Sequence, residues 1–526
     1  MTLSAHGQFD LQSLQYLNGD VFISKTLAMD DGSLTLVGNL GTQSNFVVAP
    51  TIDGSEFLFI RYNEDLIFQW AKRLNAGSKG DGIIDALASR DGGYILFGST
   101  DSDDGIFIGN SVPPTTDKNF FVAKLDSSTN VLWVQIYSCP NTFNIEALSA
   151  FENKYGEIFF SVRSDTSGGD FPMHYSNLYT YDIFVGKLDS AGNKLWVKVY
   201  GGQGTDETLK MKGDGRGGFY FCGRSSSQDL DLAGTIHSGF NGFLGRMDSS
   251  GAILWMKAFG GNSADWFNNI IVDTLAHQVV ACGMSASIDG DLQGRGILHP
   301  GFDDDYWVVA TDTLGNLKWS KWYGGTKTDV AITIEKNNAN NKYLVSGYAY
   351  SKDLDVDNLH TQLNNDIDAW IISINPIDGS IYRKRNIGGN RHDAIAEIVS
   401  IGSRNLILGA TNSSDFDFID HTFNNQSYFL AELLDFPSSV NPANAHDIEL
   451  KLYPQPVSNN LFIEWDQRIF ANLQYALYRT NGQKVFSGSL EKYRYIDMSS
   501  IASGTYYLEL LSENILIANS IISKQE

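Results

Sequence analysis

Pairs of aspartates separated by one residue recur along this sequence, and a histidine follows each pair four to eight residues later. The four sets are Asp229, Asp231 and His237; Asp289, Asp291 and His299; Asp353, Asp355 and His360; Asp415, Asp417 and His421. Aspartate oxygens gathered on a short loop are ligands for Ca²⁺, and aspartate with histidine suits a transition metal. The same residues also cap loop backbone amides in turns. Repetition favours the capping role, because catalytic sites are usually single, and metal binding or direct ligand contact are the alternatives.

Sequence signatures of established catalytic sites are missing. The chain has no G-x-S-x-G elbow, no H-E-x-x-H, no C-x-x-C pair and no phosphate-binding loop. A carboxylate pair for glycoside hydrolysis stays open, because many aspartates are expected on one face of the molecule. The three cysteines do not form a disulfide framework, and Cys222 and Cys282 occupy one repeat position that we interpret as a buried strand residue.

Three markers recur in phase with a period of about 60 residues, in the range typical of propeller blades. The first is an aromatic residue before a Gly-Gly pair, the second a glycine at the end of an apolar strand, and the third a strand before a D-x-x-G turn. The aromatic positions are Trp70, Trp133, Trp196, Trp255, Trp319 and Tyr382. The glycines are Gly38, Gly98, Gly223, Gly283, Gly347 and Gly409, with Ser161 in the third repeat.

Each repeat predicts four short antiparallel strands joined by glycine and aspartate turns. One such sheet cannot cover its own faces, so the sheets must stack around an axis, with the repeated tryptophan between blades. Six complete units begin near Val21, Gly82, Ile145, Thr208, Phe267 and Val330. A seventh begins near Ala394 and lacks its last strand, which the segment 9–19 resembles. We therefore predict an all-β fold, a seven-bladed β-propeller over residues 9–435 closed by the N-terminal strand.

Alternating strand direction places the loops that carry the Asp-x-Asp pairs on the same face of the ring as the connections between blades. Those connections contain Asp206, Asp265, Asp329 and Asp393. The sequence therefore predicts that any functional site lies on this loop-rich face.

The repeat resembles the bacterial seven-bladed β-propeller (SBBP) repeat family. The matching features are the segment 93–99, F-V-A-K-L-D at 121–126, Trp196, Gly201-Gly202 and Asp206. The D-x-x-G-x-x-L-W part is also similar to pyrroloquinoline quinone repeat propellers, but the Gly-Gly-x-x-x-Asp ending favours the first family.

After a Pro- and Ser-containing linker at 436–446, residues 447–526 lack the blade markers and predict a small Ig-like β-sandwich. This segment resembles the type A C-terminal sorting domain of type IX secretion in Bacteroidetes. The resemblance rests on the motifs at 453–463, 478–485 and 496–508, with Tyr453, Pro454, Pro456, Gly482 and Gly504 at motif positions. It implies handling of residues 447–526 by the type IX machinery, and a location outside the outer membrane or on its surface.

The net charge and the hydropathy of the chain exclude two classes of function. With 61 acidic and 38 basic residues, the net charge of −23 excludes a nucleic-acid binder, and no apolar run is long enough for a membrane span. Residues 1–8 lack the basic and apolar regions of a complete signal peptide. We expect a monomeric secreted or cell-surface propeller that binds a glycan or protein without catalysis, with Ca²⁺ as the candidate cofactor. An extracellular carbohydrate-active enzyme, a glycoside hydrolase or lyase using the loop-rich face, is the alternative.

Overall fold

The computed structural model describes residues 9–17, 21–40, 55–109, 119–138, 145–165, 168–175, 180–232, 239–292, 303–356, 366–418, 427–435, 451–454, 456–464, 474–479, 483–490, 495–512 and 515–525. Strands dominate these ranges, and the only helices found within them are 3-10 turns. Contacts divide the chain into two compact units, Leu11–Leu433 and a unit that contains Leu434–Glu526. Within the described residues, none of the helices has the length and apolar composition needed to cross a membrane.

Six four-stranded antiparallel sheets follow one another along the first unit, each built from consecutive strands. The first two sheets are β2 (Val21–Ala28), β3 (Leu34–Leu40), β4 (Ser55–Tyr62) and β5 (Phe68–Gly77), then β6 (Gly82–Ala88), β7 (Tyr94–Thr100), β8 (Asn119–Leu125) and β9 (Val131–Tyr137). The next two are β10 (Ile145–Glu152), β11 (Ile158–Ser164), β12 (Asp182–Leu188) and β13 (Lys194–Tyr200), then β14 (Asp206–Gly213), β15 (Phe219–Ser225), β16 (Asn241–Met247) and β17 (Ile253–Phe259). The last two are β18 (Asp265–Asp273), β19 (Gln278–Ser285), β20 (Asp305–Asp312) and β21 (Leu317–Tyr323), then β22 (Asp329–Asn337), β23 (Lys342–Ala349), β24 (Asp368–Ile374) and β25 (Ile381–Ile387).

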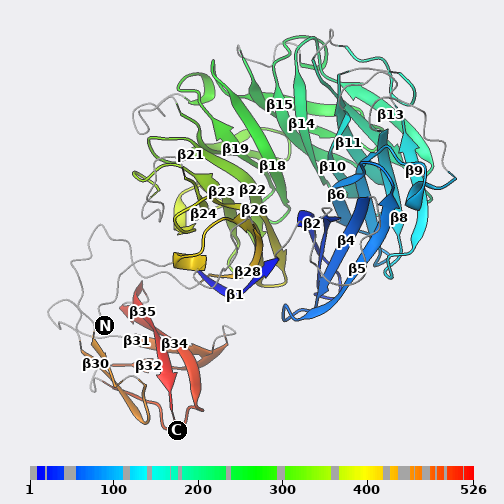
Figure 1. Ribbon diagram of the computed structural model, residues 1–526. Coiled ribbons are helices and arrows are strands. Elements are labelled where there is room, and N and C mark those ends of the chain that lie inside the picture. The colour runs from blue at the N-terminus through cyan, green and yellow to red at the C-terminus, as the bar shows by residue number, and fades with distance from the viewer. Residues whose placement is uncertain are drawn as a thin grey trace. The chain divides into compact units, whose positions relative to one another are not determined.

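A further four-stranded sheet joins the two ends of this unit. Its strands are β26 (Asp393–Ile401), β27 (Arg404–Thr411), β28 (Ser427–Asp435) and the N-terminal β1 (Phe9–Leu17), in the order β1-β28-β27-β26. Figure 1 shows β1 beside β28, as the sequence predicts, and the sheets succeeding one another from blue through green to yellow. The first strands of successive sheets contact one another, and β26 contacts β2. The repeated four-stranded sheets of a β-propeller therefore close into a ring.

The repeated tryptophans fill the space between neighbouring sheets, as predicted. A Cβ added to the turn glycine Gly315 would lie 2.7 Å from the Trp255 ring of the preceding sheet. Gly251 meets Trp196 and Gly379 meets Trp319 in the same way, at 2.9 Å. These glycines have positive φ, which suits the D-x-x-G turn. The repeated tryptophan and the repeated turn glycine thus contact each other between neighbouring sheets.

The glycine on the second strand of each sheet has a separate role. It lies opposite a β-bulge in the first strand, seen as a register shift at Ile23/Lys25 and at the same position of the other sheets. A Cβ on Gly38 would overlap the carbonyl oxygen of Phe22, and Gly283 and Gly347 are equally crowded by backbone. In the third sheet the sequence assigns this place to Ser161, but the register puts Val162 there, opposite Ala147 before the bulge, and Ser161 lies one residue earlier, opposite Ser149. A bulge re-aims the following side chain, so this glycine fixes the direction of the next residue on the inner strand.

Short 3-10 helices follow several second strands, at η1 (Gly105–Phe107), η2 (Leu230–Leu232), η3 (Gly290–Leu292) and η4 (Phe416–Phe418). In four sheets the first strand begins at the repeated aspartate, which is Asp206, Asp265, Asp329 or Asp393. For the fourth repeat the sequence places this start near Thr208, because the periodic apolar pattern begins two residues after the aspartate.

The C-terminal unit contains two sheets, described here by themselves. One has the order β29 (Lys451–Tyr453), β30 (Asn460–Glu464) and β33 (Tyr495–Asp497). The other has the order β32 (Lys484–Ser489), β31 (Gln474–Arg479), β34 (Gly504–Ser512) and β35 (Ile515–Lys524). Val457, Leu461, Leu477, Ile496 and Leu508 are fully buried in a shared apolar core.

Candidate functional site

The first aspartate of each Asp-x-Asp pair holds the connection between two sheets. Its carboxylate accepts a hydrogen bond from the backbone N–H just after the Gly-Gly pair. The bonds run from Gln203 N to Asp229 (2.8 Å), from Asn262 N to Asp289 (2.8 Å), from Thr326 N to Asp353 (2.9 Å) and from Asn390 N to Asp415 (2.9 Å). Asp104 accepts from Ser78 N in the second sheet in the same manner. These bonds are the ones expected if the pairs cap loop amides.

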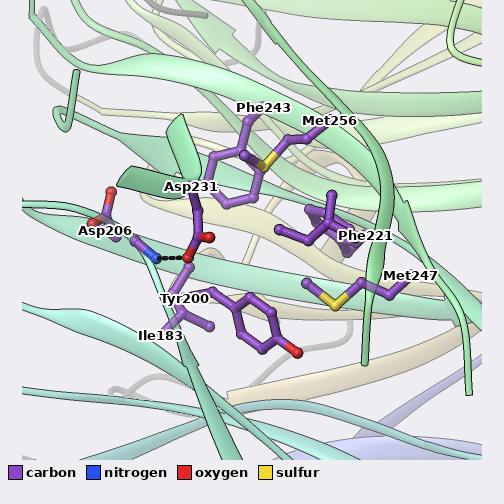
Figure 2. A pocket seen from close by; sticks show the side chains of 10 residues that line it. Ile183, Tyr200, Asp206, Phe221, Asp231, Phe243, Met247 and Met256 are labelled. Atoms are coloured by element: carbon purple, nitrogen blue, oxygen red, sulfur yellow. Dashed lines mark hydrogen bonds between the residues drawn. The ribbon is translucent and has the colours of Figure 1, made fainter. Parts of the chain in front are cut away.

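The second aspartate binds the first glycine of the same connection. Gly201 N donates to Asp231 at 3.2 Å, as the dashed line in Figure 2 shows, and Asp291 and Asp417 accept from Gly260 and Gly388. In the sixth repeat the contact runs from Asp355 N to Gly324 O at 3.1 Å. The cavity drawn in Figure 2 has a volume of about 20 Å³ and is walled by apolar side chains such as Phe221 and Met256. It has no room for more than a water molecule.

The residue between the two aspartates lies in the left-handed region. Its φ is +51° at Leu230, +60° at Gly290, +55° at Leu354 and +48° at Phe416. Such values are costly for bulky residues. The two flanking hydrogen bonds keep this turn in place in spite of that cost.

The Gly-Gly-x-x-x-Asp aspartates are buried at the base of the same connections. Asp206 accepts from Gly202 N at 2.8 Å and from the hydroxyls of Ser225 and Ser227. Burial raises the pKa of Asp206, Asp329 and Asp393 to about 6, although these hydrogen bonds oppose the rise. The Asp-x-Asp loops and the connections between sheets therefore lie together, as the sequence predicts. Their carboxylates accept hydrogen bonds from backbone N–H groups and serine hydroxyls of the protein itself.

The described residues give no support to the hypothesis that the Asp-x-Asp loops bind a metal ion. No group of three or more histidine, cysteine, aspartate or glutamate side chains is positioned there to hold a metal ion. His237, His299, His360 and His421 lie outside the described residues. The related His174 is described, and its Nδ1 lies 3.7 Å from the Asp182 carboxylate.

A much larger cavity lies elsewhere, among the first strands of the sheets. Its volume is about 640 Å³, and its walls come from β2, β6, β10, β14 and β18 together with the turns that follow several of them. These turns are on the face opposite the Asp-x-Asp loops. A volume of this size suits a small-molecule ligand. We call it the axial cavity.

One residue from each first strand, the one directly after the bulge, forms a polar belt that we call the axial ring. Its members are Lys25, Asp85, Ser149, Lys210, Asn269, Thr333 and Glu397. The first five line the axial cavity. Thr333 and Glu397 join the belt through their contacts with Asn269 and Lys25.

The acidic side of the ring is tightly paired. Lys25 Nζ lies 2.6 Å from Glu397 and 4.0 Å from Asp85. Burial by itself would lower the pKa of Lys25, but the two carboxylates raise it above its usual range. Glu397 also accepts from Thr26 N at 2.7 Å, and Asp85 from Ala86 N at 2.9 Å.

The other lysine of the ring has neutral ring neighbours. Lys210 stands between Ser149 and Asn269, and burial lowers its pKa against the attraction of Asp85. Ser149 Oγ accepts from Met211 N at 3.2 Å, and Asn269 donates to Thr333 Oγ1 at 3.4 Å. Two lysines at equivalent positions thus have opposite pKa shifts, because only one of them sits between carboxylates.

Sequence reasoning missed the axial ring. The seven positions carry lysine, aspartate, serine, asparagine, threonine and glutamate, so no motif marks them. The sequence signal is indirect: each ring residue except Ser149 pairs with the residue just before the repeated glycine of the second strand, at a fixed place in the period.

The sorting-motif residues lie in the C-terminal unit. Tyr453 is exposed and stacks on Phe462, with ring centroids 5.6 Å apart. Pro454 and Pro456 are exposed, and Gly504 opens β34. Gly482 lies outside the described residues.

Comparison with solved structures finds chains of low similarity. Drosophila Plexin A, solved in complex with Semaphorin 1b, has 9% identity and a TM-score of 0.38, covering 81% of this chain and 88% of its own. A member of the DUF4221 family from Bacteroides vulgatus has 10% identity and a TM-score of 0.32, covering 81% and 97%. An apocarotenoid oxygenase mutant from Synechocystis has 9% identity and a TM-score of 0.32, covering 82% and 96%. These scores are too low to place the chain in any of their families, and no curated protein matches it.

The C-terminal unit gives a specific match. The profile of the secretion system C-terminal sorting domain matches residues 451–524. The match spans every strand of both sheets in this unit, from β29 to β35. The C-terminal segment of this chain therefore belongs to the type IX secretion sorting domains, which the export machinery handles, and it marks the protein for the cell surface or the exterior.

Proposed function

We propose that this protein is a non-catalytic binding protein of the cell surface or exterior, in which the propeller takes a ligand and the sorting domain provides export. The observation that carries this proposal is the axial cavity of about 640 Å³ with its polar ring. Pockets of this size with a few placed polar groups are typical ligand sites. The ligand class that the sequence favours is a glycan or a protein; the cavity, as distinct from a flat surface, favours a glycan or another small molecule.

The loop-rich face supports a binding role over a catalytic one. The aspartates described there accept hydrogen bonds from the loop backbone. A general acid or nucleophile needs its carboxyl group directed to the substrate. We propose domain boundaries of 9–435 for the propeller, 436–446 for the linker and 447–526 for the sorting domain. We also propose a monomer, because β1 completes the last sheet from within the chain.

The test uses the full chain on a glycan array and, in parallel, in digestion assays on plant and algal polysaccharides. Saturable binding without release of reducing ends or unsaturated products is the expected result. Product release with turnover would contradict the non-catalytic assignment and favour the carbohydrate-active enzyme that the sequence leaves open.

A further inference from the structure

The charges around the axial cavity nearly balance, although the whole chain carries 61 acidic against 38 basic residues. The charged side chains in its walls are Lys25, Arg90, Lys210, Lys212, Asp30, Asp85 and Glu152. Two further carboxylates act on these lysines: Glu397 of the axial ring pairs with Lys25, and Glu335 on β22 attracts Lys212. The cavity therefore gives a charged ligand of either sign little electrostatic advantage.

The lysines of the axial ring are attracted to carboxylates of the protein itself. Lys25 Nζ lies 2.6 Å from Glu397 and 4.0 Å from Asp85. The same two carboxylates attract Lys210 against the burial that lowers its pKa. An ionic ligand would have to draw one member of such a pair away from its partner, which is costly for partly buried charges. A neutral ligand leaves these pairs intact.

Hydrogen-bonding groups of the axial ring stay accessible inside the cavity. The side chain of Lys25 keeps 35% of its surface exposed and that of Asp85 keeps 13%, and both residues line the cavity. Ser149 Oγ accepts from Met211 N and still has a proton to donate. An ammonium group has three protons to donate, and a carboxylate accepts several hydrogen bonds. The ring thus offers donors and acceptors close together, which suits hydroxyl groups because a hydroxyl both donates and accepts.

Apolar side chains line the cavity next to this polar ring. Leu87 and Phe151 follow Asp85 and Ser149 by two residues on the same strands, so they lie on the same side and nearer to the turns. Met29 adds a further apolar group after β2. A sugar has the same two parts, with hydroxyl groups at the edge of its ring and C–H groups on its faces. The walls therefore match a sugar in polarity as well as in charge.

We propose that the axial cavity binds a neutral saccharide, free or at the end of a glycan chain, whose hydroxyl groups donate to Asp85 and accept from Lys25 and Ser149. The cavity walls include the exposed residues Asp30 and Arg90 on the turns, so the sugar enters from the face opposite the Asp-x-Asp loops. A volume of about 640 Å³ has room for a disaccharide. This inference rests on the proposed binding function and names its ligand class.

The experiment is calorimetric titration of the full chain with saccharides that differ in charge. The neutral probes are glucose, galactose, maltose, cellobiose and lactose, and the charged counterparts are glucuronate, galacturonate, glucosamine and galactosamine. We expect at least one neutral probe to bind, and all four charged probes to bind at least tenfold more weakly. Because the neutral sugar forms no ion pair, its affinity should change less than about twofold between low salt and 150 mM NaCl.

Two variants assign the contact to the axial ring. D85N keeps an oxygen for Ala86 N but replaces the carboxylate that accepts from the sugar, and it should weaken binding at least tenfold. S149A removes a hydroxyl donor without changing the charge, and it should weaken binding at least threefold. D103N removes the same charge as D85N from an exposed loop after β7 of the same sheet, and it should leave binding unchanged. Melting temperatures without sugar identify a variant that does not fold, and either ring variant by itself tests the contact.

Three results would overturn the inference: none of the neutral probes binds the folded wild-type chain, a charged probe binds more tightly than every neutral one, or the folded ring variants bind as wild type does. If the glycan array then still reports a ligand whose binding is the same in D85N and S149A, the proposed function stands and only the axial site falls. If a neutral sugar binds through the ring but polysaccharide is cleaved, the site stands and the non-catalytic assignment falls.

Discussion

At the scale of single residues, the packing of each repeat depends most on its glycines. The turn glycines accept a tryptophan from the preceding sheet, and the second-strand glycines accept the bulged backbone of the first strand. Both roles exclude a side chain for reasons of space. The aspartates of the loop-rich face have an equally local role, because their carboxylates bind loop amides.

The contact between tryptophan and turn glycine can be tested with a matched pair. Gly315 and Gly92 have nearly equal φ values, +81° and +84°, but only Gly315 faces a ring, whereas a Cβ at Gly92 meets nothing within 4 Å. G92A should cost about 1 kcal/mol of unfolding free energy from its backbone conformation. G315A should cost about 2–3 kcal/mol more, since the Trp255 ring must shift. Equal losses in urea titrations of the two variants would show that the tryptophan contact contributes little.

A substitution in an Asp-x-Asp loop can distinguish the capping of backbone amides from metal binding. D289A removes the acceptor of Asn262 N and of Asn262 Nδ2, so we expect a loss of about 1–3 kcal/mol in unfolding free energy. For chelator-stripped wild type, added Ca²⁺ should give no heat and no change in melting temperature. A Ca²⁺-dependent rise in melting temperature that D289A abolishes would instead support the metal hypothesis.

Buried carboxyls predict how stability depends on pH. The pKa of Asp206, Asp329 and Asp393 is raised to about 6 by burial, above the ordinary value near 3.8 in the unfolded chain. The folded state therefore binds these protons more tightly, and the stabilisation present below pH 3.8 is lost as the pH rises through about 6.

We accordingly expect the D329N variant to reduce the decline in melting temperature between pH 5 and pH 7.5. D126N serves as the control, because hydrogen bonds from Asn130 and Ser128 lower the pKa of Asp126, which gives the opposite dependence. A wild-type profile whose slope in this window is the same in D329N would show that Asp329 is not protonated on folding.

At the scale of elements, much of the fold could be predicted from the sequence, because the repeated markers have structural roles. Tryptophan, turn glycine and strand glycine recur since every sheet needs the same contacts, and they located the strands to within about two residues. The axial ring could not be found in this way. Its residues face a cavity and not a neighbouring sheet, so packing does not require them to be alike, and Lys25 and Lys210 acquire opposite environments only after the ring closes.

The N-terminal strand is expected to be essential for the ring. Leu17 is buried against Leu406, Leu408 and Leu430 in the core that joins the first and last sheets. Deletion of residues 1–20 leaves the β28 edge unpaired and exposes this apolar cluster. We predict a lower melting temperature for the whole propeller, measured by calorimetry. If the truncated chain melts at the wild-type temperature, β1 contributes nothing to closure.

At the scale of the whole molecule, folding and export are assigned to separate parts. The two units have separate apolar cores, and only the second matches the sorting-domain profile. Deletion of residues 436–526 should therefore leave the melting transition of the propeller nearly unchanged but prevent its appearance at the cell surface or in the medium. Immunoblots of cell fractions measure the second effect. Normal export of the truncated chain would show that another segment directs secretion.

The pairing of β1 with β28 also sets an order of events during synthesis. About 410 residues separate the two strands, so β1 has to wait until nearly all of the first unit has been made. Contacts between such distant segments form slowly, because a long loop must be closed first. During that interval β1 stays unpaired and open to pairing with another copy of the chain. Ring closure is therefore expected to be the slow, concentration-sensitive step of refolding, and the sorting signal is complete only after the strand that permits closure has been translated.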